Sequence, residues 1–176
     1  MAKLQVRYYG DPILRKKCKR VEAITDEIRQ LVLDMVETSD ANNGIGIAAP
    51  QVGHDLALFI LRDYIESPDG KVGISDYYRV YINPTICFVS EETCIEEEGC
   101  ISLPQMRAPV ERPYKIIIEA TDMDGNRFKE EIEGYNARVR LHENDHINGV
   151  LYIDRVDKEV RKSLEQKLRE LKSRHG

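Results

Sequence analysis

No run of apolar residues in the sequence approaches the roughly 18 residues that a membrane-spanning helix needs. The first ten residues, MAKLQVRYYG, lack the apolar core of a secretion signal. They also lack the Arg- and Ser-rich amphipathic pattern of an organelle-targeting peptide. We therefore expect a cytoplasmic protein that is not held in a membrane.

The sequence has no excess of positive charge. Its 26 Lys and Arg residues face 31 Asp and Glu residues, which gives a formal net charge of −5. A mildly acidic chain has no overall attraction to nucleic acid or to an anionic membrane surface. The balance leaves room for a local basic patch, but we expect neither nucleic acid nor membrane as a partner.

Cysteine is scarce, with four residues in the chain. In a reducing compartment, so few cysteines do not form a disulfide framework, and each is a small buried hydrophobe, a ligand or a nucleophile. Cys87 lies between Ile86 and Phe88, and we expect it to be buried. Cys18 and Cys94 show no ligand spacing.

The length of 176 residues fits one domain, and we expect residues 1–176 to form it. Helical spacing of apolar residues and an N-cap at Thr25 predict a helix that ends near residues 40–43. A second helix is predicted over residues 135–148, with Gly149 as its stop, and a third from Lys158 onward. One helical turn is expected over residues 11–17.

The remaining apolar segments are predicted to be extended. The expected strands cover residues 56–61, 80–82, 86–89, 114–120 and 127–132, with a short extended piece at 151–153. Residues 62–79 are expected to be a loop, and residues 44–53 too rich in Gly and Pro for a regular element. Strands and helices do not alternate regularly, so the order predicts an α+β fold.

The sharpest chemical signal is the segment His142-Glu143-Asn144-Asp145-His146, an HExxH pattern inside a predicted helix. Residues four apart lie on one helix face, so both imidazoles can reach one metal ion. Glu143 directly follows the first histidine, where it can contact a water on the metal. Asp145 either holds a histidine or caps the helix locally.

A catalytic metal site of this type needs a third protein ligand. Glu159 and Glu165 are the downstream candidates, and Cys100, next to Gly99 in a polar segment, is the upstream candidate. A glutamate as the third metal ligand would make the protein resemble a zinc endopeptidase. Four protein ligands would instead make a metal-dependent interaction module without catalysis.

Two other patterns have simpler interpretations. The segment GIGIAAPQVG lacks the Lys-Ser/Thr of a phosphate-binding loop, so it is either a structural turn or a loop that approaches a ligand, with Gln51 as a neutral donor and acceptor. The acidic runs, including EEE at residues 96–98, are expected to be solvated, and His54 and His175 to be surface residues.

Three separated segments, GIGIAAPQVG, EEGCISLP and HENDHINGVLYIDR, occur in the order and approximate spacing of the peptide deformylases. Together they resemble that family over residues 8–156. The resemblance implies an α+β fold in which mixed, mainly antiparallel strands surround the HExxH helix. It also implies a metallohydrolase that removes the formyl group from the N-terminal formylmethionine of newly made polypeptides and releases formate. Whether it meets these substrates at the ribosome, and its oligomeric state, stay open.

The resemblance also implies a metal site. Cys100, His142 and His146 are the implied ligands of one divalent ion, usually Fe²⁺, for which Zn²⁺, Ni²⁺ or Co²⁺ can substitute. A water on the metal is the implied nucleophile, and Glu143 is its general base.

The remaining implied roles concern the substrate. The side-chain amide of Gln51 and the backbone N–H of Ile101 are implied to stabilise the carbonyl oxygen. Ile45, Gly46 and Arg107 are candidate substrate-binding residues, although a surface ion pair explains Arg107 equally well.

Two residues depart from the family pattern. Leu141 stands where the family usually has Gln, and Asn144 where it usually has an apolar residue. Both departures affect the packing around the helix rather than the implied ligands.

Overall fold

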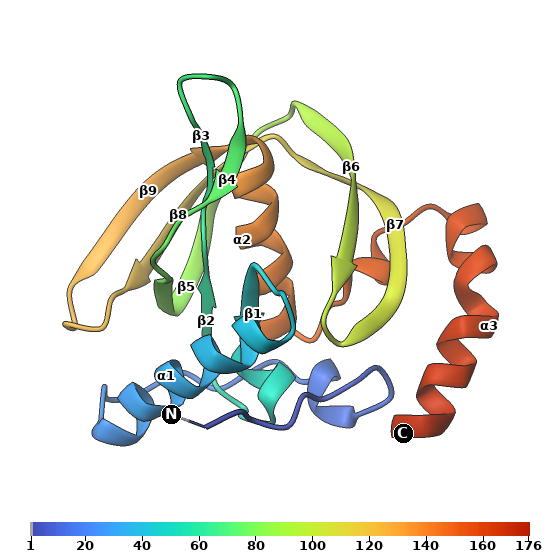
Figure 1. Ribbon diagram of the computed structural model, residues 1–176, viewed down its shortest axis with the longest axis horizontal. Helices are drawn as coiled ribbons and strands as arrows, with labels where there is room; N and C mark the ends of the chain where they lie inside the picture. Colours follow the sequence, from blue (N-terminus) through green and yellow to red (C-terminus); the bar gives the residue numbers. More distant parts are fainter. Residues whose placement is uncertain (1) are drawn as a thin grey trace.

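The computed structural model describes residues 2–176 and has α2 (Gly134–Ile147) at its centre, with strands on two sides (Figure 1). On one side lies an antiparallel sheet with the strand order β1-β2-β5-β8-β9. Its strands are β1 (Gly46–Ala48), β2 (Leu58–Leu61), β5 (Arg79–Val89), β8 (Lys115–Thr121) and β9 (Arg127–Glu133). The predicted α+β class is confirmed.

On the other side of α2 lies a two-stranded antiparallel ribbon of β6 (Thr93–Cys100) and β7 (Leu103–Pro113). The sequence analysis assigned no strand here. The C-terminal helix α3 (Lys158–His175) packs outside this ribbon, as Figure 1 shows. Its predicted apolar stripe is buried there, with Leu164, Leu168 and Leu171 in one cluster with residues of β7.

The central position of α2 explains why it is buried on nearly all sides. Its buried residues include apolar Ala137, Val139 and Leu141, but also Arg138 and Arg140. A helix enclosed on all sides has no single apolar face, so its polar residues need partners in the surrounding strands. The helix stops before Gly149, as predicted, with φ of 72° at this residue.

The first helix, α1 (Asp26–Ala41), also matches its prediction. The Thr25 hydroxyl caps it by accepting a hydrogen bond from the backbone N–H of Ile28 at 3.3 Å. Its buried residues Leu31, Val32 and Met35 pack in one cluster with residues of β1 and β2. The short turn η1 (Pro12–Arg15) lies within the predicted helical turn.

Three local predictions were wrong. Residues 62–79 contain a hairpin of β3 (Tyr64–Glu66) and β4 (Val72–Ile74) rather than a loop. The glycine-rich segment forms β1 and a 3₁₀ turn, η2 (Ala49–Val52). In the piece at 151–153 only Leu151 is extended, because η3 (Tyr152–Asp154) turns the chain there, with the backbone N–H of Leu151 bonded to Asp154.

The two strands predicted around Asn83-Pro84 form the single strand β5, with irregular pairing to β8 between Ile82 and Thr85. The burial predicted for Cys87 was wrong, since this residue is exposed. Its neighbour Phe88 is also 48% exposed. An apolar neighbourhood in the sequence therefore did not indicate a buried position at this end of β5.

Among residues 2–176, no helix has both the length and the apolar composition needed to cross a membrane.

Candidate metal centre

The fold brings Cys100 to the two histidines of the HExxH segment. His142 and His146 stand one turn apart on α2, and Cys100 ends β6 on the facing ribbon. One ligand atom from each of the three residues lies within 4.8 Å of the others. The Sγ of Cys100 is 3.3 Å from Nε2 of His146. Two imidazole nitrogens and one sulfur form a donor set that suits iron, zinc and related divalent metals.

The orientation of His142 is set by a hydrogen bond between its Nδ1 and Oε1 of Glu98, at 2.8 Å. An ionised carboxylate can only accept, so Nδ1 carries the proton and Nε2 is the ring nitrogen left for a metal. Such a carboxylate partner is the usual support of a metal-binding histidine. The structure therefore fits a metal at the Nε2 side of His142.

Glu98 is itself fixed by two arginines. Both of its oxygens accept hydrogen bonds from Arg112, at 2.6 and 2.9 Å, and Oε2 also accepts one from Arg138 at 2.6 Å. Burial alone raises the pKa of Glu98, but the bonds from Arg112 and His142 outweigh it and hold the pKa far below its usual range. The sequence analysis missed this residue.

Glu98 also corrects the expectation that the acidic run at residues 96–98 is solvated. Its neighbours Glu96 and Glu97 are exposed, whereas Glu98 is only 4% exposed. Alternation along the strand points Glu97 away from α2, and Glu98 is held inward by Arg112 and Arg138. One signal in the sequence could have indicated that Glu98 is buried. It lies two residues before the ligand Cys100 in an extended segment, so both side chains point to the same face.

Asp145 neither holds a histidine nor caps the helix with its side chain. Its carboxylate accepts hydrogen bonds from Arg112 at 2.9 Å and from Arg155 at 2.7 and 2.8 Å. Arg112 thereby connects Asp145 to Glu98, and the carboxylate stabilises the arginine that orients Glu98.

The second ligand, His146, is only 1% exposed, and its Nδ1 has no hydrogen-bond partner within residues 2–176. Burial lowers the pKa of His146 well below 6.5, which keeps the ring neutral and able to donate a lone pair. For His142, burial also lowers the pKa, but hydrogen bonds to Cys100 and Glu98 outweigh it and the net pKa is raised well above 6.5. A positive charge between His142 and Cys100 is therefore favoured, as a proton or as a metal cation.

Glu143 is buried beside the ligands, and its Oε2 has no hydrogen-bond partner within residues 2–176. Burial raises its pKa to about 7. A carboxyl group with this pKa can both take up and release a proton near neutral pH. Gly46 makes room for it, because a Cβ at Gly46 would lie 2.9 Å from Oε1 of Glu143.

Gln51 is fixed in η2 with its amide directed at the ligand cysteine. Its Oε1 accepts a hydrogen bond from the backbone N–H of Ala48 at 2.9 Å. Its Nε2 lies 3.4 Å from Sγ of Cys100 and 3.1 Å from Oγ of Ser102. Ser102 is a fully buried partner that the sequence analysis did not identify.

A cavity of about 550 Å³ opens onto these residues. Cys100, His142, Glu143 and Gln51 line it. The other predicted substrate-contacting residues also line it: Ile45, Gly46, Ile101, Arg107 and Val139. Arg107 is exposed, and its guanidinium donates a hydrogen bond to the backbone carbonyl of Glu97 at 3.3 Å.

The alternative third ligands are not brought to the histidines. Glu159 and Glu165 are exposed on α3, and Glu165 pairs with Arg169 on the same helix at 3.4 Å. His54 and His175 are exposed, as expected. Within residues 2–176, the group of close ligand atoms contains Cys100, His142 and His146 alone.

Comparison with known proteins places this geometry in a family. Residues 3–162 match the polypeptide deformylases. Peptide deformylase 1 of Clostridium perfringens is 46% identical over 88% of this chain and 98% of its own length. The peptide deformylase of Pseudothermotoga lettingae is 40% identical over 95% of this chain and 91% of its own length.

The solved structures agree. The crystal structure of the peptide deformylase from Thermus thermophilus superimposes with a TM-score of 0.86 at 34% identity and covers 99% of each chain. That of Thermotoga maritima has a TM-score of 0.81 at 36% identity, over 89% of this chain and 99% of the other. The chain belongs to the polypeptide deformylase family, metal-dependent hydrolases that remove the N-formyl group from nascent peptides.

Proposed function

We propose that Cys100, His142 and His146 hold one divalent metal ion and that Glu143 moves the proton in the deformylation of formylmethionyl peptides. The convergence of three ligand atoms within 4.8 Å, next to a buried glutamate in a cavity, carries this proposal. When bound at such a site, a divalent metal lowers the pKa of a water molecule and polarises a carbonyl oxygen.

Glu143 acts as general base and then as general acid. Its unpaired Oε2 faces no competing donor within residues 2–176, and its pKa of about 7 suits both directions of transfer. It takes a proton from the attacking water and passes it to the amine that leaves. Glu143 directly follows the ligand His142 on α2, so its carboxylate lies beside the metal site. The proton transfer therefore stays within the cavity.

Gln51 and Ile101 stabilise the oxygen of the formyl group as it gains negative charge. The Gln51 amide is held in place by Ala48, and one of its N–H groups turns from Cys100 or Ser102 to the substrate oxygen. The backbone N–H of Ile101 follows Cys100 directly in the chain and supplies the second donor. Preorganised donors of this kind typically contribute about 100-fold or more each to the rate.

The substrate is held in the cavity with its methionine side chain beside Ile45, Ile101 and Val139. These three apolar residues line the cavity near the metal ligands. The formyl carbon carries hydrogen where other acyl groups carry a carbon substituent, so a narrow site at the metal would admit it and reject bulkier acyl groups. Gly46 contributes a strand edge without a side chain, and Arg107 lies at the outer wall.

We propose Fe²⁺ as the native ion, with Zn²⁺, Ni²⁺ or Co²⁺ able to substitute. A thiolate ligand and an oxidisable metal make the site sensitive to air, because the cysteine can oxidise to sulfenic and sulfinic acid. The Fe²⁺ form is expected to lose activity in air faster than the Ni²⁺ form. Mass spectrometry should locate cysteine oxidation at Cys100, and equal lifetimes of the two forms would contradict an iron site.

The direct test is anaerobic purification followed by metal analysis and measurement of formate release from a formyl-Met peptide. Cys100→Ala is expected to lose tight metal binding and activity. Cys94→Ala, a half-buried cysteine on the same strand, serves as the matched control and should keep both. Tight metal binding that survives in Cys100→Ala would show that another residue is the third ligand.

A further inference from the structure

The β3–β4 hairpin presents apolar side chains towards the cavity. Tyr64 pairs with Ile74 and Glu66 pairs with Val72 across the two strands. Because side chains alternate along a strand, these four residues share one face and Ile65 lies on the other. Tyr64 and Ile74 line the cavity of the metal centre. Val72 therefore extends this face outward from the cavity, with Glu66 beside it at the outer end.

These apolar residues are more exposed than their chemistry favours. Val72 is 67% exposed and Ile74 is 50% exposed. Apolar side chains gathered on one exposed face are typical of a binding surface. Tyr64 packs edge-on against Tyr135 at a centroid distance of 5.0 Å, so the inner end of this face is supported by α2.

The hairpin is fixed to α2 before any substrate binds. The side-chain amide of Asn136 accepts a hydrogen bond from the backbone N–H of Tyr64 at 2.8 Å and donates one to its carbonyl at 3.0 Å. Asp63, directly before the hairpin, forms an ion pair with Arg140 at 2.8 Å. A surface held in place in this way can bind a side chain with little cost in ordering.

The position of the hairpin along α2 indicates which substrate residue it meets. Tyr135, which supports Tyr64, stands seven residues before the ligand His142. At 1.5 Å per residue this separation is about 10 Å along the helix. An extended peptide advances about 3.4 Å per residue, so about three residues span the distance.

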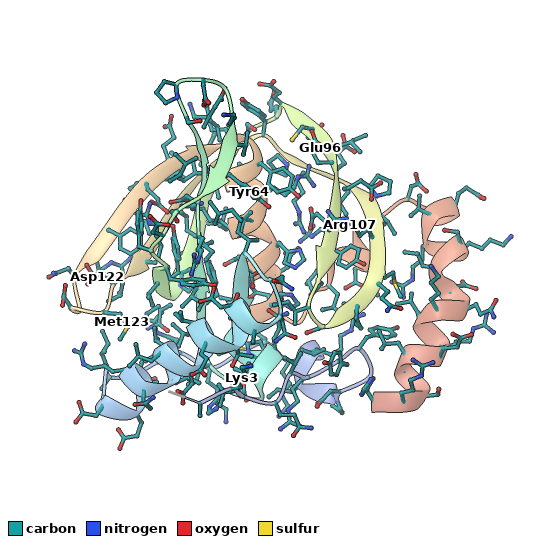
Figure 2. All side chains as sticks on the ribbon, viewed as in Figure 1. Lys3, Tyr64, Glu96, Arg107, Asp122 and Met123 are labelled. Carbon is teal, nitrogen blue, oxygen red and sulfur yellow. The ribbon has the colours of Figure 1, made fainter. Side chains whose placement is uncertain are left out.

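The opposite wall of the cavity has a different character. The β7 residues that line it are the exposed Pro104, Gln105 and Arg107 and the buried Leu103 and Met106. Figure 2 shows Tyr64 on the side of the hairpin and Arg107 on the side of β7. The β7 wall exposes the charged Arg107, whereas the hairpin lines the cavity with Tyr64 and Ile74, so an apolar side chain is better matched to the hairpin wall.

We propose that Tyr64, Val72 and Ile74 form a specificity surface for an apolar side chain at about the third residue of the formylated polypeptide. This inference rests on the proposed metal position at His142, because the distance is counted from there. It adds a preference for the substrate sequence, and the β3–β4 hairpin that provides this preference contributes no metal ligand.

The test compares two formyl-Met peptides that differ only at the third residue, Leu against Asn. We expect kcat/KM to be about three- to tenfold higher for the Leu peptide, as partial burial of one apolar side chain implies. The double variant Val72→Ser/Ile74→Ser should bring the ratio close to one. Both positions are exposed, so the fold should tolerate the change.

The matched control is Ile65→Ser, on the opposite face of the same hairpin and 47% exposed. This variant should have the same ratio of kcat/KM between the Leu and Asn peptides as the unchanged protein. Turnover of the dipeptide formyl-Met-Ala, which is too short to reach the hairpin, should stay unchanged in every variant. A ratio near one in the unchanged protein, a ratio unaffected by the double variant, or an equal loss in Ile65→Ser would each overturn the proposal. Failure to release formate from any peptide would instead reject the proposed function.

Discussion

Two buried clusters of charged side chains lie against α2, and only one of them touches the metal centre. Arg138 and Arg140 are two residues apart, so they point to roughly opposite sides of the helix. The Glu98 cluster on one side consists of Glu98, Arg112, Arg138, His142, Asp145 and Arg155. The Arg140 cluster on the other side consists of Asp63, Arg79, Tyr81, Glu130 and Arg140.

The two clusters use the same chemistry for different purposes. In the Glu98 cluster, two arginines fix a carboxylate whose remaining contact orients the ligand His142. In the Arg140 cluster, the arginine connects α2 to β9 through Glu130 and to the start of the hairpin through Asp63. Burial of charge is therefore not itself a sign of a functional site, and contact with a ligand residue is what separates the two.

The largest expected effect comes from Glu98→Gln in the Glu98 cluster. The substitution removes the carboxylate that Arg112 and Arg138 share and leaves Asp145 as the remaining carboxylate partner of Arg112. Breaking a buried ion pair in this way typically costs about 3–5 kcal/mol of unfolding free energy. It also weakens the support of His142, and loss of such a partner typically lowers metal affinity about 10- to 100-fold. Denaturant unfolding and metal titration against a competing chelator measure the two effects separately.

Glu130→Gln in the Arg140 cluster is the matched control for this change. It should lower stability as well, because Arg140 and Arg79 lose a partner, but metal affinity should stay within about twofold. An equal loss of metal affinity in both variants would remove the distinction between the clusters.

Arg140→Met should have the next largest effect. The arginine is fully buried, whereas the side chains of Asp63 and Glu130 are 15% and 13% exposed and can regain some hydration. We therefore expect a loss of about 2–3 kcal/mol, below the usual range for breaking a fully buried pair. Thermal unfolding measures it, and the folded variant should retain its metal content and its turnover of formyl-Met-Ala.

Tyr81→Phe should have the smallest effect of the series. Burial raises the pKa of Tyr81 well above its usual range, so the hydroxyl stays protonated and donates a hydrogen bond to Glu130. It also accepts one from Nε of Arg140 at 2.9 Å. Removing the hydroxyl should cost about 1–2 kcal/mol by denaturant unfolding. A change in metal affinity in this variant would contradict the separation of the clusters.

The helices and the metal ligands could be predicted from local signals. The Thr25 cap and the apolar spacing of α1 predicted that helix, and the HExxH spacing together with the family resemblance predicted the three ligands. These features depend on residues close in the chain or on short motifs. The hairpin of β3 and β4 escaped because its strands are short and partly exposed, which leaves little apolar alternation.

Glu98 could not be found by the same reasoning. Its burial depends on Arg112 and Arg138, which are 14 and 40 residues away in the sequence. An isolated view of the acidic run favours a solvated surface, because glutamate is rarely buried without a partner. The partners that make burial possible are brought in by β7 and α2, so only the fold reveals the role of Glu98.

The most direct test of the central claim compares Glu143→Ala with His142→Ala, by metal content and by formate release from a formyl-Met peptide. Glu143→Ala should retain nearly the metal content of the unchanged protein while its turnover falls at least about 100-fold, the usual effect of losing a general acid–base group. His142→Ala should lose the metal. Metal loss in Glu143→Ala equal to that in His142→Ala, or turnover near the original rate, would contradict the account.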